Sequence, residues 1–314
     1  MIQVDNLGKN YGNVKAVKGV AFSVQGSEIV GLLGPNGAGK TTIMKILTGY
    51  LFPSFGMVNI DDKNIMEQGR EIKEVVGYLP ENTPLYMDLN VYEYLNFVAD
   101  ARHLEGEHRK ERIERVIEEC GLRRMLYRNI SELSKGFRQR VGLAQAIIHD
   151  PKILILDEPT SGLDPNQILD IRDLIKRMGK KKTVMISTHI LQEVEAICNR
   201  VLILNEGRIV AQGTTEEIGK ELKGEALLYL TIKASDNTAV AKELAACGAV
   251  EKLLECEPEN SGRIRAKVSL APGADSVEKI FDWAVAKNYK LLAMVPEKIS
   301  LEDIFIKLTR EGEK

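Results

Sequence analysis

A chain of 314 residues, 44% of them hydrophobic, is long enough for two domains with a buried core in each. A formal net charge of −2 and a pI near 6.2 exclude a strongly basic surface, so we expect no nucleic-acid partner. The four cysteines lack metal-ligand spacing and no apolar run is long enough to span a membrane. We therefore expect reduced thiols and a cytoplasmic protein that reaches a membrane only through a partner.

The first predicted elements are short strands, followed by a glycine-rich loop and a helix. Residues 2–34 alternate apolar and polar side chains in short runs broken by Gly and Asn, as strands do. The loop GPNGAGKT occupies 34–41, and the apolar spacing of TTIMKILTG predicts a helix that begins near Lys40 and stops at Gly49. Each loop glycine costs roughly 0.5–1 kcal/mol relative to Ala in regular structure, so a function must require the bare backbone.

Residues 82–150 predict a helical subdomain inserted into an α/β core, with Asn90 as a helix N-cap. Three segments have helical apolar spacing and many charges: 90–104, 110–122 and 135–150. The core resumes with two apolar runs typical of buried parallel strands, KILILDEP at 152–159 and KTVMISTH at 182–189.

The end of the first domain and the second domain follow. An amphipathic helix at 166–178 separates the two apolar runs, two strands flank the turn Glu206–Gly207, and this domain ends near Thr215. After a linker at 216–224, residues 225–314 show the order β-α-β-β-α-β plus a last helix at 300–310. That order is the split βαβ of ferredoxin-like domains. This domain contains no phosphate loop, metal-ligand cluster or set of catalytic residues. We therefore expect it either to regulate the first domain or to stabilise a dimer.

The glycine-rich loop has the spacing G-x-x-x-x-G-K-[ST] of a phosphate-binding loop. Bare backbone N–H groups and the helix N-terminus attract phosphate oxygens, Lys40 reaches the β- and γ-phosphates, and the Thr41 hydroxyl can bind Mg²⁺. A chance match is the alternative, but the place between a strand and a helix disfavours it. The expected nucleotide contacts are Gly34, Pro35, Asn36, Gly37, Ala38, Gly39, Lys40, Thr41 and Thr42.

Acidic residues and a histidine end the two buried strands. Asp157 can orient the Mg²⁺ shell, and Glu158 can polarise an attacking water. His189 ends the next strand at the same edge of the sheet, where a γ-phosphate contact is favoured over a structural role. A solvated strand end is the alternative for the acidic pair, and the phosphate loop in the same chain makes it the weaker one.

The segment LSKGFRQR at 133–140 resembles the signature motif of ABC ATPases, usually written LSGGQ. The resemblance implies that Ser134 and Gly136 bind the γ-phosphate of the ATP held by a second copy of the chain. Lys135 and Phe137 replace the usual Gly and Gln, as in the bacterial ABC-2-type branch of the family.

Further positions match the same family. SGLD at 161–164 resembles the D-loop, which contacts the other subunit of the dimer. Tyr11 matches the aromatic residue that stacks on adenine, with a structural tyrosine as the alternative. GYLPEN at 77–82 matches the Q-loop, with Glu81 in place of the glutamine that senses the metal.

The resemblance covers residues 1–215 and, loosely, ISLEDIFIKLT at 299–309. It implies an α/β P-loop NTPase core of the ABC ATPase type, with a mainly parallel sheet, an antiparallel β subdomain and a helical subdomain. It also implies an ATP-binding subunit of an ABC-2-type exporter, similar to the ATPases associated with gliding motility. Two copies would bind two MgATP molecules head to tail, and the helical subdomain beyond Glu81 would dock on a membrane permease.

If the chain is such an ATPase, Glu158 is the general base that activates the attacking water, while His189 and Lys40 stabilise the γ-phosphate. Two alternatives stay open. One is a non-transport ABC ATPase that acts on ribosomes or DNA, although such members usually carry two cassettes or a long coiled coil. The other is a scaffold that hydrolyses ATP poorly, which Glu158 disfavours.

Overall fold

The computed structural model describes residues 1–214, 216–218, 226–234, 236–259, 262–271, 275–296 and 305. The chain divides into two units, one with Met1–Thr215 and Phe305–Lys314 and one with Glu216–Ile304, and each is described by itself. In the described ranges, no helix is both long enough and apolar enough to cross a membrane.

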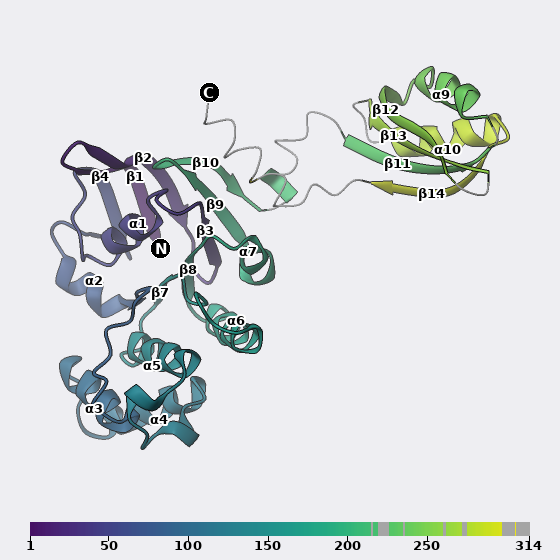
Figure 1. Cartoon of the computed structure of the whole chain (residues 1–314). Coiled ribbons are helices and arrows are strands. Elements are labelled where there is room, and N and C mark those ends of the chain that lie inside the picture. Colours follow the sequence, from purple (N-terminus) through teal and green to yellow (C-terminus); the bar gives the residue numbers. More distant parts are fainter. Residues whose placement is uncertain are drawn as a thin grey trace. The chain divides into compact units, whose positions relative to one another are not determined.

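The first unit is built on a six-stranded sheet with the order β10-β9-β3-β8-β7-β6 (Figure 1). Its strands are β3 (Ile29–Leu33), β6 (Val76–Leu79), β7 (Ile153–Asp157), β8 (Thr183–Thr188), β9 (Arg200–Asn205) and β10 (Arg208–Gly213). All neighbouring pairs are parallel except β9 and β10, which are joined by the predicted turn with positive φ at Glu206 and Gly207. The predicted buried strands at 152–159 and 182–189 are thus confirmed as neighbours, so their carboxyl ends meet at one edge.

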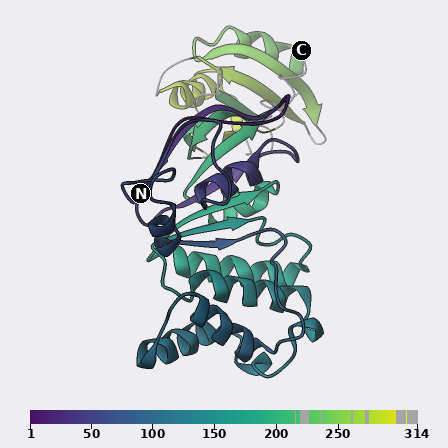
Figure 2. The same ribbon diagram turned by 90° about the vertical axis from the view of Figure 1, so that its left-hand side faces the viewer.

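A second, antiparallel sheet in this unit has the order β2-β1-β4-β5. Its strands are β1 (Ile2–Tyr11), β2 (Val14–Val24), β4 (Phe55–Ile60) and β5 (Lys63–Asn64). Helix α1 (Lys40–Leu47) lies between the two sheets (Figure 2), where Ile43 and Met44 join apolar residues of both sheets in one core. The helix begins at Lys40 as predicted, and Gly49 follows its C-cap with φ of 66°.

The other face of the six-stranded sheet is covered by α6 (Pro165–Gly179) and by the helical subdomain. That subdomain contains α3 (Val91–Ala101), α4 (Gly106–Glu119) and α5 (Lys135–Ile147), which lie together in Figure 1. Asn90 caps α3 in a complete capping box with Glu93, as its predicted N-cap role requires. The buried Arg112 guanidinium donates to the carbonyls of Ile147 and Ile148, so α4 caps the carboxyl end of α5.

Two short helices of this unit were not predicted from the sequence. They are α2 (Gly69–Val75), directly before β6, and α7 (Leu191–Ile197), directly after His189. Seven-residue helices are too short to show a clear apolar period, and tertiary packing of Ile72 and Val194 holds them in place.

The second unit contains one four-stranded sheet with the order β12-β13-β11-β14, and all three neighbouring pairs are antiparallel. Its elements in chain order are β11 (Ala226–Lys233), α9 (Asn237–Ala245), β12 (Val250–Glu259), β13 (Arg263–Leu270), α10 (Ser276–Ala286) and β14 (Lys290–Pro296). Alternate residues of β11 and β13 share a core with both helices, so α9 and α10 cover the same face. The predicted ferredoxin-like domain is confirmed.

Two predictions concern residues at the edges of this unit. In the linker predicted at 216–224, residues 216–218 are helical and Ile218 is buried, and the rest lies outside the described residues. The helix predicted at 300–310 also lies outside them, apart from Phe305, which belongs to the first unit.

Candidate functional site

The glycine-rich loop runs from the end of β3 to the start of α1 and is held tightly by its surroundings. Gly37 and Gly39 have φ of 81° and 108°, a region that side chains disfavour. A Cβ atom on Gly39 would lie 2.6 Å from the carbonyl oxygen of Ala16, and one on Gly34 would lie 2.4 Å from that of Leu204. The backbone must therefore be bare both for its conformation and for its packing.

The loop forms one side of a cavity of about 450 Å³, a volume in the range of small-molecule sites. The lining residues are Ala16, Asn36, Gly37, Gly39, Lys40, Thr41, Thr42, Glu81, Glu158, Ser161 and His189. Nine of the eleven belong to the phosphate loop, to the ends of β7 and β8 as predicted, or to the predicted Q-loop. Three of the expected nucleotide contacts, Gly34, Pro35 and Ala38, do not line the cavity. Ser161 begins the predicted D-loop, whereas Ala16 is an addition that the sequence alone did not indicate.

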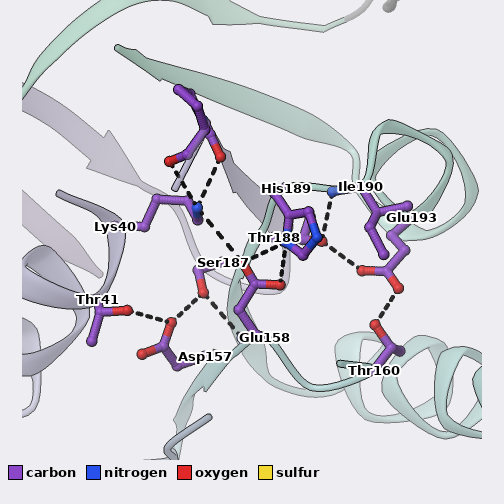
Figure 3. A network of polar contacts seen from close by, with 12 residues as sticks. Lys40, Thr41, Asp157, Glu158, Thr160, Ser187, Thr188, His189, Ile190 and Glu193 are labelled. Carbon is purple, nitrogen blue, oxygen red and sulfur yellow. Dashed lines mark hydrogen bonds and ion pairs between the residues drawn. The ribbon is translucent and has the colours of Figure 1, made fainter. Parts of the chain in front are cut away.

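Three functional side chains meet in this cavity (Figure 3). Lys40 Nζ lies 3.6 Å from Glu158 Oε1 and donates to the carbonyl oxygen of Gly34 at 2.8 Å. His189 Nδ1 lies 3.0 Å from Glu158 Oε2, and since a carboxylate only accepts, this contact requires a proton on Nδ1. Lys40 and Glu158 are buried and His189 is half-exposed, so the histidine ring faces the open side.

Asp157 and Thr41 lie beside these three side chains, and Ser187 connects Asp157 to the backbone of Glu158. The Asp157 carboxylate is 1% exposed, and its Oδ1 accepts from Ser187 Oγ and, at 3.4 Å, from Thr41 Oγ1. Its buried Oδ2 has no hydrogen-bond partner among the described residues. An unpartnered carboxylate oxygen beside a hydroxyl fits Mg²⁺, which is bound by one or two carboxylates together with phosphates and waters. No cluster of three or more His, Cys, Asp or Glu side chains in the described ranges could hold a metal without such additional ligands.

Ser187 is a site residue that sequence reasoning missed. It pairs with Asp157 across β7 and β8, and its hydroxyl and carbonyl both accept from the backbone N–H of Glu158 at 3.1 Å. These bonds hold Glu158 in the left-handed region, with φ of 48°. Strained backbone is typical of active sites, where the surrounding structure must support it. A signal existed, because Ser187 lies two residues before His189 on the same strand.

Glu81 lines the cavity with an exposed side chain and shares it with Thr41, whereas the third predicted metal residue, Asp157, does not line it. The neighbouring Tyr78 is partly buried, and burial together with the Asp157 and Glu81 carboxylates raises the pKa of its phenol. The phenol therefore stays neutral beside this acidic edge of the site.

Besides Gly34, Pro35, Ala38 and Asp157, three predicted site residues lie outside the cavity lining. Tyr11 ends β1 with its ring 47% exposed and the Lys9 ammonium 5.5 Å from the ring centroid. Ser134 caps α5 by accepting from the backbone N–H of Phe137, and Gly136 is packed against the Gln167 side chain. The structure does not bring these three together with Lys40 in one chain.

The fold and the site define a P-loop ATPase, and comparisons with known proteins identify the family. The family model described as "ABC transporter" matches residues 17–161. The bacitracin transport ATP-binding protein BcrA of Bacillus licheniformis is 34% identical over 99% of this chain and 98% of its own. The linearmycin resistance ATP-binding protein LnrL of Bacillus subtilis is 30% identical over 98% of each chain.

A solved structure agrees with these relatives. The dimeric ATP-binding cassette MJ0796, in a post-hydrolysis state with ADP and Pi, has a TM-score of 0.62 and 25% identity, over 68% of this chain and 98% of its own. The chain belongs to the family of ABC transporter ATP-binding proteins and is an ATPase that binds ATP.

Proposed function

We propose that this chain is the ATPase subunit of an ABC-2-type exporter and drives a separate membrane permease. The observation that carries the proposal is the cavity where the phosphate loop, Glu158 and His189 meet. It is supported by the relative BcrA, a bacitracin transport ATP-binding protein that matches this chain along nearly its whole length. A hydrolytic centre of this kind supplies the energy, and in this proposal the membrane path is supplied by another chain.

In the proposed mechanism Lys40 binds the γ-phosphate from the floor of the cavity. Glu158 accepts the proton of the attacking water, and the Nδ1–H bond from His189 fixes the orientation of its carboxylate. With a proton on Nε2 as well, His189 would also donate a hydrogen bond to the γ-phosphate. When bound through Thr41 and Asp157, Mg²⁺ would neutralise negative charge on the β- and γ-phosphates.

We further propose that two copies bind two ATP molecules head to tail. Ser134 is exposed at the start of α5 and lies outside the cavity lining, which suits contact with nucleotide held by a second copy. The D-loop at 161–164 begins at Ser161, which lines the cavity, so it can contact both subunits. The related cassette MJ0796 is a dimer.

The permease would dock on the helical subdomain. Exposed aromatic rings gather there: Tyr86 contacts Phe97 with ring centroids 5.0 Å apart, and Tyr92 lies 6.2 Å from Tyr127. Aromatic side chains that stay exposed together mark protein interaction surfaces. Tyr86 lies in the loop that follows Glu81, so this loop connects the cavity with the exposed ring of Tyr86.

The transport proposal is tested by purifying the tagged chain from membranes solubilised in mild detergent. A multispanning membrane protein should co-purify, and its presence in proteoliposomes should raise the ATPase rate of the chain. The Glu158→Gln protein is the control, because it should bind the same partner without hydrolysis. Recovery of ribosomes or DNA in place of a membrane protein would overturn the transport proposal while leaving the ATPase assignment intact.

Glu81→Gln should raise the Mg²⁺ concentration needed for half-maximal hydrolysis. A carboxylate near the metal strengthens its coordination, whereas the same charge repels the γ-phosphate, and each effect is worth a few kcal/mol at an effective dielectric near ~20. A titration of the ATPase rate with Mg²⁺ reports the effect on metal coordination. Nucleotide binding measured in EDTA reports the repulsion of the γ-phosphate without the metal. Binding in EDTA should change little. Glu74→Gln, an exposed site on α2, is the matched control. Superimposable Mg²⁺ curves would remove Glu81 from the metal site.

We propose that residues 1–215 form the nucleotide-binding domain and 225–314 an accessory domain that regulates it or stabilises the dimer. Each unit has its own buried core, and all cavity-lining residues belong to the first. A chain ending at Thr215 should therefore still bind ATP with the affinity of the full chain. Isothermal titration of both proteins checks this, and a folded truncated chain without ATP binding would refute the separation.

A further inference from the structure

Glu193 is a buried carboxylate that the mechanism above does not use. It lies in the first turn of α7, is 1% exposed and does not line the cavity. Thr160 Oγ1 donates to its Oε1, and Thr188 Oγ1 donates to its Oε2 at 2.7 Å (Figure 3). A carboxylate placed this deep is costly unless it is hydrogen-bonded, and here both oxygens are.

The two threonines belong to the two segments that carry the proposed catalytic pair. Thr160 follows Glu158 by two residues, and Thr188 directly precedes His189. Both hydroxyls are buried, with residue exposures of 2% and 1%. Thr188 Oγ1 also accepts from the backbone N–H of Ile190 at 3.0 Å, so the backbone on both sides of His189 is tied to the same network.

His189 needs such support, because its side chain is 45% exposed and packing holds it little. Its Nδ1 must nevertheless stay 3.0 Å from the Glu158 carboxylate. The helix that follows, α7, has only seven residues and cannot orient the segment by its own stability. One carboxylate oxygen of Glu193 accepts from Thr160 and the other from Thr188. Glu193 therefore joins the segment after Glu158 to the segment before His189.

We propose that Glu193 is a positioning residue that sets the contact between His189 and Glu158, and so acts on the rate of hydrolysis without touching nucleotide. The inference rests on the roles proposed above for His189 and Glu158. Because Thr160 is followed directly by the D-loop, Glu193 also connects the part of the chain nearest a second copy to His189.

The first test compares three variants of the full chain. Glu193→Ala should lower the single-turnover hydrolysis rate by about 10²-fold, the scale of a misplacement near 1 Å, with an unchanged Kd for ATP. Glu193→Gln keeps the volume and can bond both threonines once one hydroxyl turns to accept, so its rate should stay within about threefold of the wild type. Glu195→Gln, exposed on the same helix, is the control. Loss of ATP affinity in parallel with rate would contradict positioning.

The second test places Glu193→Ala in a His189→Ala background. If Glu193 acts through His189, its replacement should change the already slow rate by less than about twofold, because coupled residues are not additive. Single turnovers with protein in excess keep slow rates measurable. Thr188→Val serves in the same cycle if Glu193→Ala does not fold, as judged by circular dichroism.

The outcomes distinguish the inference from the proposed function. A full second loss of rate in the His189→Ala background would overturn the positioning role and leave the catalytic pair in place. Wild-type hydrolysis by His189→Ala alone would overturn the proposed role of His189, and the positioning role with it. Near-wild-type hydrolysis by Glu193→Ala would overturn the positioning role only.

Discussion

Replacing Glu158 with Gln should slow ATP hydrolysis by a factor on the order of 10²–10⁴, the usual loss for a general base. The amide cannot accept the proton of the attacking water at neutral pH, although its oxygen can still accept from His189 Nδ1. The change leaves the phosphate loop, Thr41 and Asp157 untouched, so ATP affinity should stay close to that of the wild type. Phosphate release under single-turnover conditions measures the rate, and equilibrium titration measures the affinity.

The same variant should also reveal the dimer. With the γ-phosphate uncleaved, two copies should remain together in ATP and elute earlier in size-exclusion chromatography than the wild type. Glu74→Gln, an exposed carboxylate removed in the same way, should show neither effect. Hydrolysis at the wild-type rate by the Glu158→Gln protein would show that another group is the base.

Lys40→Ala should weaken ATP binding itself, by about 10²–10³-fold. Removing one partner of a buried, hydrogen-bonded charge pair costs about 2–5 kcal/mol, and each 1.4 kcal/mol is about a tenfold change in affinity. Lys40 is only 6% exposed, so bulk water cannot easily replace its ammonium beside the phosphates. The variant also leaves Glu158 without its cationic neighbour. Titration with a fluorescent ATP analogue checks the affinity.

Lys45→Ala is the matched control for that experiment. Lys45 lies on the same helix, but its ammonium is directed over the Tyr50 ring and it does not line the cavity. Its removal should leave ATP affinity unchanged. An unchanged affinity in the Lys40→Ala protein as well would mean that the loop backbone alone holds the phosphates.

Local features of the fold followed from short sequence patterns, because each depends on neighbours in the chain. The capping box at Asn90 uses a side chain three residues away. The hairpin at Glu206–Gly207 uses two adjacent residues that accept positive φ. The phosphate loop could be recognised for the same reason, since its glycines and Lys40 all lie within residues 34–40. The apolar runs before Asp157 and His189 also indicated parallel strands whose ends meet at one edge.

Contacts between distant residues were decided only by the tertiary structure. Ser187 reaches Asp157 and the Glu158 backbone because β7 and β8 are adjacent in register, and no local pattern states that register. Glu193 was invisible for the same reason: a charged residue in a short helix normally predicts a solvated surface, and only the arrival of Thr160 and Thr188 from two other segments makes its burial favourable. By itself the sequence determined the phosphate loop and the acidic and histidine side chains that follow two buried strands. The packing of strands and loops decided which of those groups touch, because hydrogen bonds form between neighbours in space.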